Sequence, residues 1–149
     1  MRGAREITGT NRLKKNSRLD KPSNLEVAVI GAGISGLCTA LLLEQQGCDV
    51  TILEKDKQIR NEGAGIQITS NGLFVLKKLN LDGLANKVGL KPNNLCLFDE
   101  DGLESICSIE ILHRLKRRYG MSFITLHRSL LLRILFEKVK EKKIKIKFG

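Results

Sequence analysis

The chain has 149 residues, of which 42% are apolar, so it is long enough for one domain with a core of ordinary size. Its formal net charge of +10 lies at the ends: residues 1–21 carry seven Lys and Arg against two acids, residues 112–149 carry twelve against two, and residues 22–111 carry seven against twelve. Solvated basic ends without a recognition motif do not indicate a nucleic-acid partner, and no apolar run approaches the roughly 18 residues of a transmembrane helix.

The N-terminal residues 1–24 are rich in Arg and Lys and lack the apolar segment of a secretory signal peptide. We expect a basic disordered leader here, with an artefact of an upstream start site or a transit peptide as the alternatives. The four cysteines have no CxxC spacing and form no zinc pattern with the two histidines. They indicate a reduced, cytoplasmic protein without a metal site. These cysteines are Cys38, Cys48, Cys96 and Cys107.

Order is expected to begin at Leu25 with a β–α–β unit. The apolar run Val27–Ile30 predicts a strand that is buried on both faces. A glycine-rich turn follows, and then a helix with apolar residues at helical spacing that ends near Gly47. The second strand is predicted over Asp49–Glu54. The order strand, turn, helix, strand is the pattern of a nucleotide-binding unit.

The segment after this unit, Lys55–Ile68, is expected to be a loop. Ser70 or Asn71 is predicted to cap a helix that carries leucines at helical spacing, and a second short helix follows it. Two apolar runs flank the Asp-Gly pair at residues 101–102, which predicts a β-hairpin.

The C-terminal part is expected to return to the main domain, which spans residues 25–149. The hairpin lies in a predicted insertion at about residues 93–126, whose basic cluster we interpret as a solvated face. A strand is expected over Phe123–Leu126, and Ser129 is predicted to cap the last helix. Alternating apolar and charged residues predict a final strand over Ile144–Phe148.

The turn between the first strand and the first helix has the pattern GxGxxG, formed by Gly31, Gly33 and Gly36. Gly31 allows the tight turn, Gly33 lets a pyrophosphate approach the backbone, and Gly36 lets the helix pack against the strand. The helix N-terminus adds unpaired N–H groups and a partial positive charge. Glu54 ends the second strand 18 residues after Gly36, where a carboxylate can bind both ribose hydroxyls of a dinucleotide. Spacing alone leaves NAD and FAD as alternatives.

Three segments resemble the group A flavoprotein monooxygenases, which include salicylate hydroxylases, 3-hydroxybenzoate 6-hydroxylases and zeaxanthin epoxidases. The first segment is Val27–Glu54, and the second is Gly63–Ile68 followed by Asn71–Leu73. The third, Leu126–Leu131, is similar to the family's His-Arg-x-x-Leu segment. The glycine motif is generic, whereas the later segments are more specific in this order and at this distance.

The resemblance implies an α/β fold, with a truncated, Rossmann-like FAD-binding βαβ domain that carries the β-hairpin insertion. It implies FAD as cofactor, NAD(P)H as co-substrate and a small aromatic or olefinic substrate, and it indicates no catalytic residue. A cation is unfavourable at a helix start, which supports a functional role for Arg128. The implied cofactor contacts are Gly31, Gly33, Gly36, Glu54, Lys55, Gly65, Ile66, Gln67 and Arg128.

Two later signatures of the family, an Asp-Gly segment and a Gly-Asp segment that complete the cofactor site, are not found in this sequence. We therefore expect the FAD-binding N-terminal part of an NAD(P)H-dependent monooxygenase, of aromatic hydroxylase or epoxidase type, that is inactive and marginally stable alone. The alternatives are a free-standing nucleotide-binding or interaction module and an NAD-dependent oxidoreductase. The substrate and the oligomeric state are left open.

Overall fold

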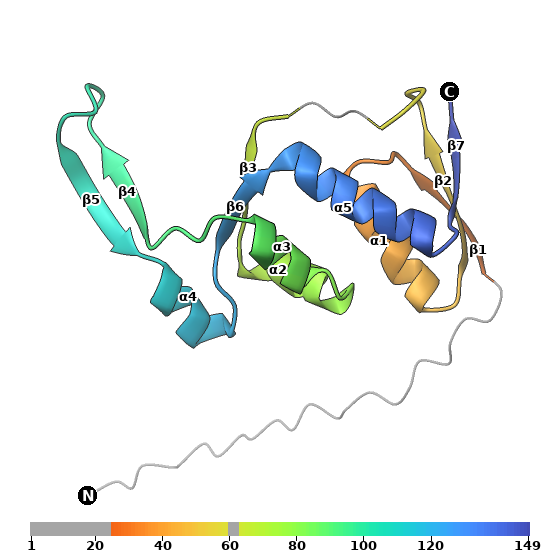
Figure 1. Cartoon of the computed structure of the whole chain (residues 1–149), viewed down its shortest axis with the longest axis horizontal. Coiled ribbons are helices and arrows are strands. Elements are labelled where there is room, and N and C mark those ends of the chain that lie inside the picture. Colours follow the sequence, from red (N-terminus) through yellow and green to blue (C-terminus); the bar gives the residue numbers. More distant parts are fainter. Residues whose placement is uncertain (1–24, 60–62) are drawn as a thin grey trace, which may run out of the picture.

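The computed structural model describes residues 25–59 and 63–149, and Figure 1 shows how their helices and strands are arranged. The predicted leader at residues 1–24 lies outside the described residues. The described strands form one parallel three-stranded sheet and two antiparallel pairs. This arrangement confirms the predicted α/β class with a Rossmann-like βαβ unit.

The βαβ unit consists of β1 (Glu26–Ile30), α1 (Ile34–Gln45) and β2 (Asp49–Glu54), as the sequence predicts. The two strands pair in parallel, and the large apolar residues of β1 lie beside those of β2: Val27 beside Val50, Val29 beside Ile52 and Ile30 beside Leu53. Gly47 follows the helix with a φ of +91°, a left-handed conformation that glycine adopts without steric cost and that ends the helix. The short connections hold the start of α1 beside the end of β2.

Only one face of the parallel sheet is covered by described residues. Val29, Val50 and Ile52 are buried in the core, whereas Ile30 is 78% exposed and Leu53 is 36% exposed on the other face. The expectation that the first strand is buried on both faces is therefore wrong for the described chain. An apolar run indicates that both faces of the strand are hydrophobic. However, α1 contacts both β2 and the last helix, α5 (Arg128–Glu141), so the two helices lie on the same side of the sheet.

The second sheet joins segments that are far apart in the sequence. β3 (Gly65–Ile68) pairs antiparallel with β6 (Ile124–His127). The loop predicted over Lys55–Ile68 is thus wrong for its last four residues, because a strand with a weak local pattern forms when a distant partner supplies its hydrogen bonds. The strand predicted over Phe123–Leu126 is confirmed as β6, and β7 (Lys145–Phe148) confirms the final strand by pairing in parallel with β2.

The helices predicted after the βαβ unit are confirmed, but their predicted caps are wrong. Thr69 and His127 are the N-cap residues, and neither makes a side-chain cap hydrogen bond. Ser70 already lies inside its helix, where its hydroxyl donates to a distant carbonyl, and Ser129 Oγ lies 2.6 Å from Nδ1 of His127. The bounds of the helices are α2 (Ser70–Lys78), α3 (Asp82–Val88) and α5 (Arg128–Glu141).

A projecting arm, residues 94–119, contains the predicted hairpin. Its strands β4 (Asn94–Phe98) and β5 (Ser105–Glu110) are antiparallel, and the helix α4 (Leu112–Tyr119) follows them. The arm extends from the side of the molecule opposite the parallel sheet (Figure 1). The basic cluster is indeed exposed, although the sequence interpretation assigned no helix to it. The insertion at about residues 93–126 stays a prediction. No helix among the described residues is long and apolar enough to span a membrane.

Candidate dinucleotide-binding site

The glycine-rich turn between β1 and α1 has no space for a side chain at one glycine and has free space at another. A Cβ atom added to Gly36 would overlap the carbonyl oxygen of Gly31, whereas one added to Gly33 would meet no atom within 4 Å. Gly31 has a φ of +95°, and its N–H donates to the carbonyl of Leu53 at 2.7 Å. The turn is therefore held against β2, and the backbone at Gly33 is open to a ligand.

The N-terminus of α1 presents free hydrogen-bond donors at this opening. The first hydrogen bond of the helix runs from the N–H of Leu37 to the carbonyl of Gly33, at 2.9 Å. The N–H groups of Ile34, Ser35 and Gly36 consequently have no acceptor within the helix. Such donors, together with the helix dipole, attract phosphate oxygens. No acidic side chain in the first turn of α1 opposes this attraction.

Glu54 links the end of β2 to the same turn. Its Oε2 accepts a hydrogen bond from the N–H of Ala32 at 2.6 Å, and its Oε1 accepts one from the N–H of Asp56 at 3.0 Å. These donors, the Asp56 N–H first and the Ala32 N–H second, lower the pKa of the Glu54 carboxyl. The side chain is therefore an ordered carboxylate beside the turn, and it can accept hydrogen bonds from hydroxyl groups.

The two later segments are brought together by backbone pairing. In the β3-β6 pair, Gly65 lies beside His127, and the N–H of Arg128 donates to the carbonyl of Ala64 at 3.0 Å. A Cβ atom at Gly63 would lie 3.1 Å from Cβ of Arg128. Arg128 is exposed and is the first residue of α5. Arg128 thus directly follows β6, the strand that pairs with the Gly-Ile-Gln segment of β3.

A cavity of about 510 Å³ connects the glycine-rich turn with this second segment. Ile34 and Ser35 line it from the first turn of α1, and Ile66 and Gln67 line it from β3. Other predicted contacts do not line this cavity: Gly31, Gly33, Gly36, Glu54, Lys55, Gly65 and Arg128. Of these, Lys55 is exposed directly after Glu54. The structure therefore groups the predicted residues at the turn and at the β3-β6 pair, with the cavity between the two groups.

Two polar groups near the turn were not singled out from the sequence. The N–H of Ala32 binds Glu54, and Ser35 lines the cavity. Both occupy variable positions of the GxGxxG pattern, so a search for polar atoms between its glycines would have found them. Among the described residues, no cluster of three or more His, Cys, Asp or Glu side chains is arranged to hold a metal ion.

Comparison with known proteins decides between the kinds of nucleotide-binding protein. Residues 26–144 match the family described as FAD dependent oxidoreductase. The chain belongs to this family. Among curated relatives, it is 30% identical over 103 residues to 3-hydroxybenzoate 6-hydroxylase 1 of Aquipseudomonas alcaligenes, which covers 69% of this chain and 26% of the relative. It is 28% identical over 103 residues to 6-hydroxynicotinate 3-monooxygenase of Pseudomonas fluorescens, which covers 69% of this chain and 27% of the relative.

Solved structures also resemble this chain. The tetrameric form of 2-methyl-3-hydroxypyridine-5-carboxylic acid oxygenase superposes with a TM-score of 0.73 at 26% identity, over 84% of this chain and 31% of that one. HpxO of Klebsiella pneumoniae, solved in complex with FAD and uric acid, superposes with a TM-score of 0.68 at 25% identity, over 84% of this chain and 31% of that one. The chain thus spans about a quarter to a third of the relatives that it matches. The resemblance to FAD-dependent aromatic monooxygenases is confirmed.

Proposed function

We propose that this chain binds the ADP part of FAD at the turn between β1 and α1. The observation that carries the proposal is the contrast between Gly33 and Gly36, since an added Cβ would meet open space at Gly33 and the Gly31 carbonyl at Gly36. A pyrophosphate would accept hydrogen bonds from the free N–H groups of the first turn of α1. Glu54, held by two backbone donors, would accept hydrogen bonds from the ribose hydroxyls. Lys55 would lie beside the adenine end.

The β3-β6 pair would hold the part of FAD nearer the flavin. Gly65, Ile66 and Gln67 would offer backbone groups there, and a Cβ atom at Gly65 would meet no atom within 4 Å. Arg128 would bind a phosphate or the ribityl hydroxyls through its planar fork of donors. The open backbone at Gly33 and Gly65 and the unpaired donors of α1 fit a dinucleotide that lies along this surface.

Ligand titration tests the proposal. The purified chain is expected to bind FAD and ADP, and Gly33→Val is expected to weaken both because its side chain occupies the opening. Gly33 has a φ of −75° and free space around it, so the variant is expected to fold. Gly83→Val is the matched control, since Gly83 also has no atom within 4 Å of an added Cβ but lies in α3. Equal FAD affinity in the chain and the Gly33 variant would rule out this site.

For the complete enzyme, we propose NAD(P)H-dependent monooxygenation of a small aromatic or olefinic substrate. Bound FAD would supply the redox chemistry and the activation of oxygen, while this chain would bind and orient its adenine half. The names of relatives, such as 3-hydroxybenzoate 6-hydroxylase, support the aromatic class. The chain itself spans 26% of that relative, so we propose no substrate-binding residue within it.

Two further assignments belong to this proposal. The alternative of a free-standing module predicts ADP binding without any contribution of the β3-β6 pair, so a preference for FAD over ADP and NAD would argue against it.

The four cysteines are free thiols in the structure, which supports a reducing, cytoplasmic location. No nucleic-acid partner is proposed.

A further inference from the structure

Gly63 lies against the side chain of Arg128, the cation proposed above to bind FAD. A Cβ atom added to Gly63 would lie 3.1 Å from Cβ, 3.5 Å from Cγ and 3.4 Å from Cδ of Arg128. These distances are at or below the roughly 3.5–4.0 Å at which two carbon atoms attract each other most. The absence of a side chain at residue 63 therefore leaves the room that the aliphatic stem of Arg128 occupies.

The backbone of Arg128 is held by the residues that follow Gly63. The N–H of Arg128 donates to the carbonyl of Ala64 at 3.0 Å, and His127, the residue before it, pairs with Gly65. Arg128 is also the first residue of α5. The segment around the start of β3 thus contacts Arg128 at both its backbone and its stem, which restricts the conformations of a long side chain.

The guanidinium of Arg128 is available to a ligand. The residue is exposed, and the ion pairs between described residues involve other cations. A long side chain ordinarily loses conformational freedom when it binds a ligand, which lowers affinity by roughly two- to tenfold. An arginine whose stem is already held in place avoids much of this loss.

We propose that Gly63 is a positioning residue for Arg128 in the cofactor site, an inference that rests on the proposed contact between Arg128 and FAD. The missing side chain of Gly63 lets the arginine stem lie along the segment that leads into β3. The guanidinium is consequently held beside the β3-β6 pair before FAD binds. Gly63 acts through the arginine and not through a contact of its own with the cofactor.

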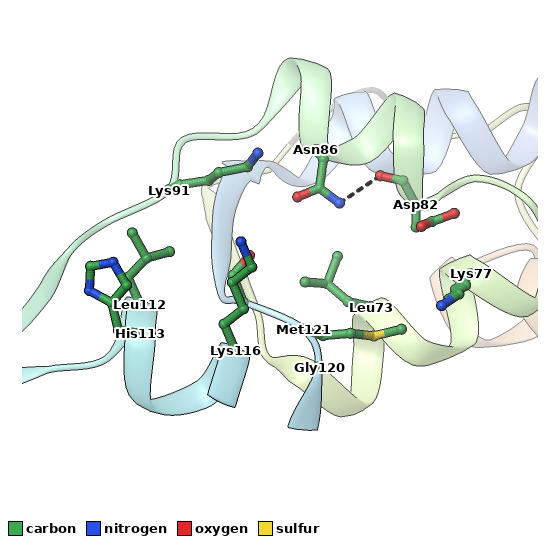
Figure 2. Close-up of a pocket in the computed structure, with 11 residues that line it drawn as sticks. Leu73, Lys77, Asp82, Asn86, Lys91, Leu112, His113, Lys116, Gly120 and Met121 are labelled. Carbon is green, nitrogen blue, oxygen red and sulfur yellow. Dashed lines mark hydrogen bonds between the residues drawn. The ribbon is translucent and has the colours of Figure 1, made fainter. Parts of the chain in front are cut away.

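A second group of cations provides a comparison. Lys77, Lys91 and Lys116 line a cavity of about 380 Å³ between α4 and the pair α2 and α3, and Figure 2 shows their side chains around it. None of the proposed FAD contacts lines this cavity. Lys116→Ala therefore removes one positive charge from an exposed position outside the proposed site.

A double-mutant cycle, measured by FAD titration of the purified 149-residue chain, tests the proposal. Gly63→Ala is expected to weaken FAD binding about two- to tenfold, because its methyl group displaces the arginine stem. In the Arg128→Ala background the same substitution is expected to change the affinity by less than about twofold, since no guanidinium remains to be displaced. Any strain from the φ of +159° at Gly63 is present in both backgrounds, so the cycle separates it from the effect on the arginine.

Two control variants are expected to keep the affinity of the parent. Gly83→Ala makes the same substitution in α3, where an added Cβ meets no atom within 4 Å. Lys116→Ala tests whether the loss of any cation weakens binding. A loss of affinity in Lys116→Ala equal to that in Arg128→Ala would show that FAD responds to general charge, and it would overturn the proposal.

The remaining outcomes distinguish this inference from the proposed function. An equal loss of affinity from Gly63→Ala in both backgrounds would overturn the positioning role, because strain or a direct contact would then be the cause. A loss in Arg128→Ala without any loss in Gly63→Ala would also overturn it and leave the arginine contact standing. Unchanged affinity in Arg128→Ala would refute the arginine contact and this inference with it.

A measurement without FAD completes the test. Carbon-13 relaxation at Cδ of Arg128 in the ligand-free chain reports how freely the stem moves on the fast timescale. The order parameter is expected to be higher in the parent than in Gly63→Ala, with Cδ of Arg133 unchanged as the internal control. Equal order parameters at Arg128 in the two proteins would overturn the positioning role whatever the titrations show.

Discussion

Gly33 and Gly36 lie three residues apart in the same turn, yet an added methyl group would meet different surroundings at each. At Gly36 it would overlap the carbonyl oxygen of Gly31, in the turn between β1 and α1. At Gly33 it would project into open space. The same residue type thus has a packing role at one position, and at the other the proposed role of leaving room for a ligand.

We predict that Gly36→Ala is destabilising by about 3 kcal/mol or more, because overpacking beside backbone leaves no flexible side chain to move. Gly33→Ala is expected to change the free energy of unfolding by less than about 0.5 kcal/mol, as for an ordinary surface substitution. Urea denaturation followed by circular dichroism measures both. Similar losses in the two variants would show that the turn is packed differently.

The lowered pKa of Glu54 predicts a specific dependence of stability on pH. The folded pKa lies below the ordinary value of 4.5, so the charged side chain stabilises the fold fully above that pH, and the contribution is lost as the pH falls through the folded pKa. Glu54→Gln is therefore expected to be less stable than the parent at pH 7, with the difference narrowing below about pH 4.5. Denaturation at pH 7, 5 and 4 checks this, and a difference that stays constant with pH would contradict it.

Arg128 is predicted to contribute to cofactor affinity and little to folding, since its side chain is exposed. Loss of a charge-assisted hydrogen bond costs about 1.5–3 kcal/mol, so Arg128→Ala should weaken FAD binding roughly ten- to a hundredfold. FAD titration of a longer protein that includes the downstream region is the measurement. Arg133→Ala, an exposed position on the same helix, is the control. Unchanged FAD affinity in Arg128→Ala would remove the proposed contact.

Some helices and strands can be predicted from their own sequence pattern, whereas others form only because a distant segment pairs with them. α5 presents a continuous buried face, with Leu131, Leu135 and Val139 in the core, and its pattern is visible in the sequence. β3 has four residues, including Gly65, and forms because β6 pairs with it. α5 follows β6 directly and packs on α1, so it connects the β3-β6 pair to the βαβ unit.

This position of α5 makes its central leucine a sensitive site. Leu135 is fully buried, and Leu135→Ala is expected to lower the free energy of unfolding by about 2–5 kcal/mol through lost burial and a cavity. Leu130, on the same helix, is only partly buried, so Leu130→Ala should cost clearly less. Chemical denaturation of the two variants makes the comparison, and equal losses would argue against a core centred on this helix.

At the scale of the whole molecule, apolar surface remains exposed on the open face of the parallel sheet and on the arm. Ile30 and Leu53 lie beside each other on that open face. The match covers only 26% and 31% of the length of the relatives compared above. Exposed apolar surface and strand edges favour association with other chains.

We therefore predict that the 149-residue chain alone melts at a low temperature and does not oxidise NAD(P)H above the background of free flavin. A thermal melt and an NAD(P)H oxidation assay with added FAD are the measurements, with FAD alone as the control. A cooperative melt at high temperature together with oxidation above that background would show that this short form is a functional unit.

The sequence by itself determined the features that depend on local geometry. The tight turn at Gly31 needs a positive φ, the apolar face of α5 follows the helical period, and the Asp-Gly pair directs a hairpin, so each is visible within a short window. The βαβ unit and the distance from Gly36 to Glu54 follow from the same local rules.

Only the tertiary structure decided the features in which distant residues meet. The bond from Ala32 to Glu54 joins residues 22 apart, β3 forms because β6 supplies its hydrogen bonds, and the open face of the sheet results from both helices packing on one side. The helix caps were mispredicted for the same reason, since Ser70 donates to a carbonyl 51 residues away. Residues that are distant in the sequence determine which groups form hydrogen bonds and which side chains are buried. A short stretch of sequence does not specify which of these distant residues will be its neighbours in the fold.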